Sequence, residues 1–242
     1  MKAVIQAGGQ GTRLRPYTMV LPKPLMPVGE QPVIELLLKW LRRNGISDVF
    51  ITTGYLGHLI KAFCGDGSDW DMNIQYSDED EPLGTVGALN LVSDWLDDTF
   101  LVLNGDLITD LCLREFRQFH LRHGGPLSVA TTSKAVRVDM GVIQHDGDRI
   151  VAFQEKPTLN YRVNMGLYLV APEVLEWIPK GMPFGFDHLI QQMLADGAAV
   201  HAYQHDGSWL DIGRPEDFVR AQEMVEALQD PSSRPMRVVP SG

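Results

Sequence analysis

The chain has 242 residues, of which 44% are hydrophobic and 21% are charged, as expected for a globular protein of one large or two small domains. Its formal net charge of −10 argues against nucleic acid as a partner, because a phosphate backbone requires a basic surface. No apolar run approaches the ~20 residues that span a bilayer, and the first apolar stretch is too short for a signal peptide. We therefore expect a cytoplasmic protein without a membrane anchor.

The acidic charge is unevenly distributed along the chain. Residues 1–43 carry +5, from seven lysines and arginines against two glutamates, so the remainder carries −15. A local basic patch in an acidic protein suits a small anionic ligand better than a long polyanion.

The basic patch contains a Gly-rich loop directly after a predicted strand over residues 2–6. The loop has three glycines, and two basic residues follow: Gly8, Gly9, Gly11, Arg13 and Lys23. Glycines let backbone N–H groups approach phosphate oxygens, and the basic residues supply the charge that a triphosphate requires. The spacing excludes a Walker A loop and the dinucleotide fingerprint, since Leu14 stands where the latter needs its third glycine. The loop therefore indicates nucleotide binding of another kind.

Up to about residue 125, short apolar segments alternate with helical ones. The predicted strands cover 2–6, 48–53, 73–77 and 99–104, and the predicted helices 32–44, 57–63 and 83–95. This alternation predicts a Rossmann-like, doubly wound α/β fold with a mixed, mostly parallel sheet.

The pattern changes after residue 125. Strands are predicted at 127–133, 141–145 and 149–154, the last two joined as a hairpin by Asp146-Gly147-Asp148. A strand at 164–170, helices at 172–177 and 186–195, a strand at 199–205 and a helix at 215–228 follow. We expect one domain over 1–228, with halves 1–125 and 126–228, and a flexible Pro/Ser-rich tail over 229–242.

One aspartate stands where a metal ligand would be useful. Asp106 follows the apolar strand at the carboxyl edge of the sheet, where open α/β sheets bind ligands. The position of Asp211, just before the last predicted helix, does not by itself indicate a metal ligand. Carboxylates are ligands that Mg²⁺ prefers. Taken alone, each is also consistent with a turn or helix-capping aspartate.

The segments GGQGTRLRP and PKPLMPV resemble the signature of the sugar-1-phosphate nucleotidyltransferases, and further motifs of that family follow in order to about residue 228. The resemblance implies Mg²⁺-dependent transfer of a nucleoside monophosphate from an NTP to a sugar 1-phosphate, with release of pyrophosphate.

The resemblance also implies roles for the N-terminal motif and the two aspartates. Arg13 would stabilise the pentavalent α-phosphate and Lys23 would bind phosphate oxygens. Asp106, in L-N-G-D, and Asp211, in W-x-D-x-G, would hold Mg²⁺. The triphosphate would be cradled by Gly8, Gly9, Gly11 and Thr12.

In the second half, which would bind the sugar, Glu155 and Lys156 match the family's E-K-P. The glutamate would hold sugar hydroxyls and the lysine the sugar phosphate, although a surface ion pair is the usual interpretation of such a dipeptide. Asn164 would hydrogen-bond the sugar and Gly166 would leave room for it. Gly141 stands where the family has Y-G or F-G, but methionine replaces the aromatic residue, so a ring contact there is in doubt.

Gly84 and Thr85 occupy the place where the family reads the nucleobase. The acidic run at 78–81 is consistent with a solvated loop, or Glu81 pairs with the N1–H and amino group of guanine. Gln6 points either into the edge of the core or toward the base.

The segment E-P-L-G-T and the short chain look most like those of mannose- or heptose-1-phosphate guanylyltransferases, a resemblance that implies GTP and a mannose- or heptose-type sugar 1-phosphate. The alternatives are a glucose-1-phosphate thymidylyltransferase, an amino-sugar-1-phosphate uridylyltransferase and, in another class, a non-catalytic regulatory subunit that binds an NDP-sugar. A homodimer is possible: residues near Trp177, Phe184 and Phe186 suit either a subunit contact or the core.

Overall fold

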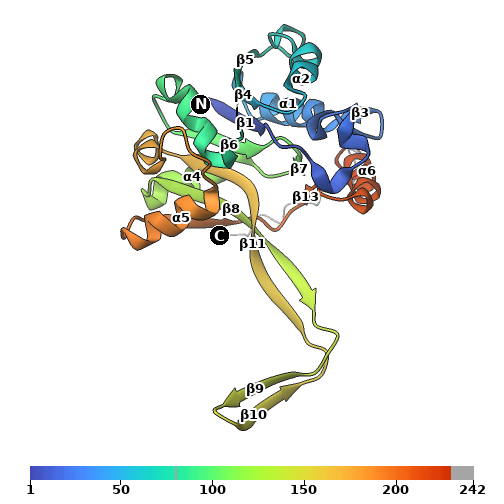
Figure 1. Cartoon of the computed structure of the whole chain (residues 1–242), viewed down its shortest axis with the longest axis vertical. Helices are drawn as coiled ribbons and strands as arrows, with labels where there is room; N and C mark the ends of the chain where they lie inside the picture. The colour runs from blue at the N-terminus through green and yellow to red at the C-terminus, as the bar shows by residue number, and fades with distance from the viewer. Residues whose placement is uncertain (80, 230–242) are drawn as a thin grey trace, which may run out of the picture.

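The computed structural model describes residues 1–79 and 81–229, and its centre is a seven-stranded sheet (Figure 1). The strands are β1 (Ala3–Ala7), β4 (Asp48–Thr53), β5 (Asn73–Asp78), β6 (Phe100–Asn104), β8 (Leu127–Arg137), β11 (Thr158–Val170) and β12 (Val200–Gln204). Their order is β12-β8-β11-β6-β1-β4-β5. Only β11 runs antiparallel to its neighbours in this sheet, which confirms the predicted α/β fold with a mixed, mostly parallel sheet.

Helices cover both faces of the sheet, because the apolar side chains of each strand alternate between two buried clusters. One cluster includes residues of α1 (Val33–Arg43), α2 (Gly57–Cys64) and α4 (Leu113–His123). The other includes residues of α3 (Gly84–Gly87), α5 (Phe186–Ala195), and the 3₁₀ helices η5 (Ala88–Trp95) and η6 (Pro172–Trp177). Shorter 3₁₀ helices are η1 (Thr12–Leu14), η2 (Tyr17–Met19), η3 (Lys23–Leu25) and η4 (Ser68–Trp70).

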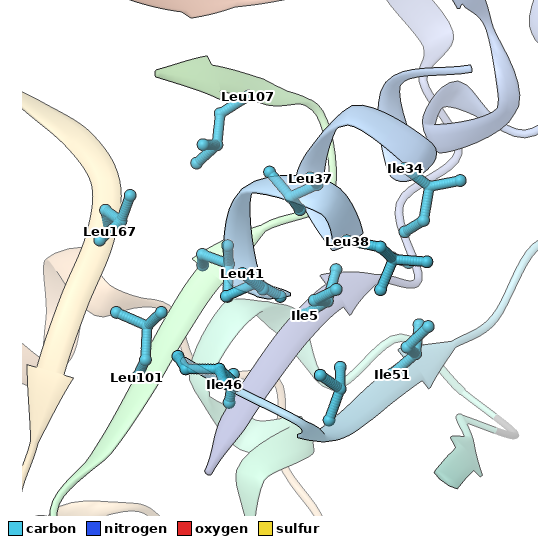
Figure 2. Packing of buried hydrophobic residues seen from close by; sticks show 14 of the residues in the cluster. Ile5, Ile34, Leu37, Leu38, Leu41, Ile46, Ile51, Leu101, Leu107 and Leu167 are labelled. Carbon is cyan, nitrogen blue, oxygen red and sulfur yellow. The ribbon is translucent and has the colours of Figure 1, made fainter. Parts of the chain in front are cut away.

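Helix α1 shows how the sequence specifies this packing. Its apolar residues recur at helical spacing, so that Ile34, Leu37, Leu38 and Leu41 lie on one face and are buried against β1 and β4 (Figure 2). Burying each such side chain contributes about 1.5–3 kcal/mol. The helix ends before Gly45, whose φ of 78° suits glycine.

Three small antiparallel ribbons complete the described chain. They are β2 (Pro27–Val28) with β3 (Gln31–Pro32), β7 (Leu107–Thr109) with β13 (Trp209–Asp211), and β9 (Val142–Asp146) with β10 (Arg149–Gln154). Helix α6 (Pro215–Gln229) packs on a third apolar cluster together with Ile108 and Leu210 of the β7–β13 ribbon.

Two helix predictions differ from the structure. The single helix predicted over 83–95 was wrong, because only α3 is α-helical and η5 continues as a 3₁₀ helix. The Ser93 hydroxyl donates to the Asn90 carbonyl (3.1 Å), so a side chain competes for a group that a regular helix would use. Helix α4 was not predicted, because charged residues crowd its short apolar face.

Two strands are longer than predicted, and together they form a projecting arm. The strand predicted at 127–133 continues to Arg137, and the strand predicted at 164–170 already begins at Thr158. The added residues of the two strands pair with each other, from Val163↔Thr132 to Thr158↔Arg137. The predicted hairpin, β9–β10, lies at the free end (Figure 1). We call residues 132–163 the arm and the other described residues the body.

Other expectations concern the body. Phe186 is buried, and Trp177 and Phe184 pack on the same core cluster, so these residues belong to the core. Cys64 is buried, and burial raises the pKa of its thiol to about 12. Within the described ranges, no helix has the length and apolarity needed to cross a membrane. The predicted tail lies, from residue 230, outside the described residues.

Candidate functional site

The Gly-rich loop leaves β1 at the carboxyl end of the sheet. Gly11 has a φ of 59°, and a Cβ there would lie 2.9 Å from the Thr18 methyl group, so glycine is required on both grounds. The Thr18 hydroxyl donates to Gly11 O (2.8 Å), and the buried Leu14 anchors the loop in the body. A Cβ on Gly9 would meet no atom within 4 Å, so the loop backbone faces open space that a ligand can enter.

The β7–β13 ribbon brings together the two aspartates, which are far apart in sequence. Asp211 is in register with Leu107, and the Ile212 N–H donates to Asp106 O (3.0 Å). The Trp209 indole N–H donates to Met165 O (2.9 Å) and so ties β13 to β11. Asp106 and Asp211 therefore lie on the same side of the Gly-rich loop.

Lys23 links these aspartates to the loop. It is held between Pro22 and Pro24 in η3, and its Nζ donates to Asp106 Oδ2 and lies 3.3 Å from Asp211 Oδ1. One cation therefore contacts two carboxylates at this edge of the sheet, which leaves a net negative charge there.

The Asp106 carboxyl is also suited to bind a metal ion. Burial raises the pKa of Asp106 above its ordinary value, the Lys23 ammonium opposes this, and the Asp211 carboxylate adds to it. Its Oδ1 atom is buried and has no hydrogen-bond partner within the described ranges. An acceptor oxygen left free in this way fits Mg²⁺, which typically binds one or two carboxylates and the phosphates of a substrate. In the part of the chain that the structure describes, no group of three or more potential metal-ligating side chains occurs, so substrate oxygens would have to complete the coordination.

Two adjoining cavities, each of about 250 Å³, open at this edge and share Gln6, Gly9 and Asp106. The first is also lined by the loop residues Gly11, Thr12, Arg13 and Lys23. The second is also lined by Gly8, Thr52, Glu79, Pro82, Gly84, Thr85 and Asn104. The Gly-rich backbone, Arg13 and Lys23 make the first cavity suitable for an anionic group of a ligand, and the second cavity adjoins it.

Arg13 supplies a second positive charge to the first cavity. Its guanidinium lies over Gly213, where an added Cβ would be 3.4 Å from Nη1. Its side chain is exposed and makes no hydrogen bond or ion pair with any described residue. It also borders a third, open cavity of about 930 Å³ at the root of the arm. The guanidinium is therefore available to an anionic ligand.

The second cavity is shaped by a tight backbone contact. Gly84 has a φ of 73°, and a Cβ there would lie 2.8 Å from Phe184 O, so the α3 turn can approach the loop before α5 only with glycine. The Thr85 hydroxyl accepts from Phe186 N–H (3.2 Å). These contacts hold the cavity wall that contains Gly84 and Thr85.

Of the acidic run, Glu79 and not Glu81 lines the second cavity. Glu79 Oε2 accepts from Leu83 N–H (2.8 Å), and burial raises the pKa of its carboxyl. Glu81 is exposed and lines neither cavity. The signal that identifies Glu79 is its position directly after β5, at the same edge as Asp106.

Gln6 lines both cavities from the end of β1. Both polar atoms of its amide are buried and have no hydrogen-bond partner in the described residues. A buried amide without partners costs about 1–3 kcal/mol, so a ligand that bonded to it would recover this cost. Gln6 thus lines both cavities while both polar atoms of its amide are buried.

The residues predicted to bind the sugar are divided between two places. Gly166 (φ 72°) packs against Asn104 of the second cavity, and Asn164 beside it donates to the Tyr168 hydroxyl (2.6 Å) and accepts from Gly166 N–H (2.9 Å). By contrast, Gly141, Glu155 and Lys156 lie exposed on the arm. The structure does not bring these three to the cavities of their own chain.

Residues 2–227 match the protein family described as nucleotidyl transferase. The chain is a member of the nucleotidyl transferase family. Among its relatives in that family are the UTP–glucose-1-phosphate uridylyltransferase of Synechocystis, 32% identical over 91% of this chain, and the mannose-1-phosphate guanyltransferase of Saccharomyces cerevisiae, 34% identical over 90%. The chain spans 62% and 63% of the length of these two relatives.

The nucleotidyl transferase fold is also seen in solved structures. A putative glucose-1-phosphate thymidylyltransferase from Bacillus anthracis, solved in complex with a sucrose, superimposes with a TM-score of 0.75 and 27% sequence identity. The superposition covers 93% of this chain and 94% of that one.

Proposed function

We propose that this protein transfers a nucleoside monophosphate from an NTP to a sugar 1-phosphate and releases pyrophosphate. The observation that carries the proposal is the convergence of Lys23, Asp106 and Asp211 beside an open Gly-rich loop. Membership of the nucleotidyl transferase family and relatives that are named for this reaction support it.

The chemistry requires positioning and charge neutralisation more than proton transfer. The phosphate oxygen of the sugar is already a good nucleophile, so no general base is needed. Backbone N–H groups of the loop would hold the triphosphate, and the guanidinium of Arg13 would bond to the α-phosphate as it gains negative charge. Lys23 would orient phosphate oxygens from its fixed place between two prolines.

Asp106 and Asp211 would hold a magnesium ion, to which the free Oδ1 atom of Asp106 offers a ligand. Bound there, Mg²⁺ would neutralise phosphate charge and favour pyrophosphate as the leaving group. We expect a chelator to abolish turnover and added Mg²⁺ to restore it. Full turnover in excess chelator would remove the metal from the proposal.

We propose GTP as the nucleotide and a mannose- or heptose-type sugar 1-phosphate as the acceptor. Guanine presents two adjacent donors, N1–H and the amino group, and Glu79 places a carboxylate acceptor in the wall of the second cavity. The guanyltransferase among the relatives agrees with this choice. A uridylyltransferase is similarly related, so UTP and dTTP with glucose- or amino-sugar phosphates are the alternatives.

The test is pyrophosphate release in the presence of Mg²⁺, with GTP, dTTP, UTP, CTP and ATP supplied separately against a pool of aldose 1-phosphates. We expect release with GTP. Release only with UTP or dTTP would retain the reaction and change the base. Binding of nucleotide-sugars without release, by folded protein, would favour a non-catalytic regulatory subunit over an enzyme.

A further inference from the structure

The arm carries apolar side chains, yet no other part of its own chain buries them. No residue from 132 to 163, all of which are described, is buried. At its free end Ile150 is 60% exposed and Phe153 61%, beside Met140 at 73%. A two-stranded ribbon is marginal in water unless it packs against something else, so this ribbon requires a packing partner.

The register shows that the exposed apolar residues share faces. In the hairpin, Phe153 pairs with Ile143. In the stem, Leu159 pairs with Val136, and Tyr161 lies two residues further along on the same face. Along the stem part of β11, apolar and polar residues alternate as in a half-buried strand. In β10 the residues from Ile150 to Phe153 are all apolar instead, so the arm presents apolar side chains that its own chain does not bury.

The hairpin end of the arm also holds the charged residues Glu155 and Lys156. A Cβ on Gly141 would touch the Phe153 ring and lie 3.3 Å from Glu155 Oε2, so these three residues lie together. Lys156 follows with a φ of 44°, a conformation that costs free energy for a non-glycine residue and is concentrated at functional sites. Neither the Glu155 nor the Lys156 side chain has a hydrogen-bond or ion-pair partner in the described chain.

The arm cannot deliver these groups to its own cavities without breaking its pairing. The six paired residues of each stem strand hold the hairpin about 20 Å beyond the last body pairs. Figure 1 shows the hairpin at the far end of the molecule, with no other labelled element beside it.

The body has an exposed apolar segment on which the arm of another copy can pack. Tyr17, Met19 and Val20 are 59–75% exposed and lie in the segment between Arg13 and Lys23, two residues that line the first cavity. The arm and the body therefore both present exposed apolar side chains, those of the body in the segment that follows the Gly-rich loop.

We propose that the arm docks on a second copy of this chain, across the candidate site, and that two copies exchange arms in a two-fold dimer. Glu155 and Lys156 of one copy then serve the sugar-phosphate side of the site in the other. Exchange is reciprocal, because the same arm and the same rim occur in both copies. This inference rests on the proposed function for the role of Glu155 and Lys156, but not for the dimer.

Hybrid dimers test the exchange directly. Asp106→Asn and Lys156→Ala chains carrying different affinity tags are co-expressed, and the hybrid is isolated by two successive purifications. Each variant alone should be inactive. In the hybrid, the intact site of the Lys156→Ala chain is served by the intact arm of its partner, so about half of the wild-type rate should return. Lys180→Ala, an exposed lysine of the body, is the matched control and should remain active alone.

Three results would overturn the inference. The first is failure to recover any hybrid. The second is a hybrid that stays inactive, which would mean that each arm serves the site of its own chain. The third is a Lys156→Ala protein that is fully active alone. Absence of turnover in the wild type would reject the proposed function, and the exchange would then be judged by molecular mass alone.

Light scattering after size exclusion supplies that second readout. We expect a dimer for the wild type and for Leu121→Ser, which alters an equally exposed apolar residue (64%) of the body. We expect Phe153→Ser to shift toward the monomer at the same concentration. A monomeric wild type, or a dimer unaffected by Phe153→Ser, would contradict the exchange.

Discussion

The body and the arm use the same strands in opposite circumstances. In the body, β8 and β11 run between other strands and two layers of helices, and residues such as Leu127 and Leu169 are fully buried. In the arm, the same two strands pair only with each other, and alternating apolar residues such as Val136 and Tyr161 are exposed. Alternation of apolar and polar residues along a strand therefore predicts that one face of the strand is buried. It does not predict whether the same chain or another chain buries it.

The largest expected effect tests whether the body supplies the groups at the reacting phosphate. Asp106→Asn keeps the size of the side chain and removes one charge from the pair that Lys23 bridges. We expect turnover to fall on the order of 10³-fold, because charge developing on phosphate is stabilised there, while the melting temperature stays close to that of the wild type. Asp94→Asn, an exposed carboxylate of the body, is the control. Unchanged turnover would remove Asp106 from the mechanism.

A slightly smaller effect is expected for Arg13→Lys. Lysine keeps the charge but loses the planar fork that matches phosphate oxygens, so we expect turnover to fall on the order of 10²-fold. Arg42→Lys, on the exposed surface of α1, should have no effect in the same assay. Activity of the Arg13→Lys enzyme within a few-fold of wild type would show that a point charge suffices.

Stability measurements contrast the two regions directly. Ile51→Ala removes a fully buried side chain of the body and should lower the free energy of unfolding by about 2–5 kcal/mol at any protein concentration. Ile150→Ala removes an exposed side chain of the arm and should cost less than about 0.5 kcal/mol in dilute protein. If arms are exchanged, the cost at Ile150 grows with concentration. Urea titrations at two concentrations measure both, and a large, concentration-independent cost at Ile150 would mean that the arm is covered within its own chain.

The smallest expected effect concerns Gln6. Gln6→Met removes two buried polar atoms that have no partner in the described residues, so we expect the free protein to gain about 1 kcal/mol of stability. The same change should weaken the rise in melting temperature that a nucleotide causes. Gln75→Met, at an exposed position of β5, is the control. A destabilised free protein together with an unchanged nucleotide effect would show that Gln6 is structural.

Local patterns predicted most of the sheet and the Gly-rich loop, because strand alternation, helix periodicity and glycine spacing depend on neighbouring residues. The β7–β13 ribbon was not predicted, since three-residue strands carry too little alternation to be recognised and their pairing joins distant segments. Sequence reasoning singled out Glu81, whereas Glu79 lines the second cavity, for a similar reason. Which of the two lies at the edge of the sheet depends on where β5 ends, and that end is set by the register of β5 with β4. The arm was not predicted, because the local pattern does not show that the strands predicted at 127–133 and 164–170 continue to pair with each other beyond the sheet.

The ribbon that holds Asp106 and Asp211 together also sets the order in which the site can be completed during synthesis. A growing polypeptide that has left the ribosome only as far as β12 already contains the Gly-rich loop, Lys23 and every strand of the central sheet. It still lacks β13, and with it the second carboxylate and the backbone bond from Ile212 to Asp106. A translation product that stops before Trp209 would therefore contain every strand of the central sheet and still lack half of the carboxylate pair of the candidate site.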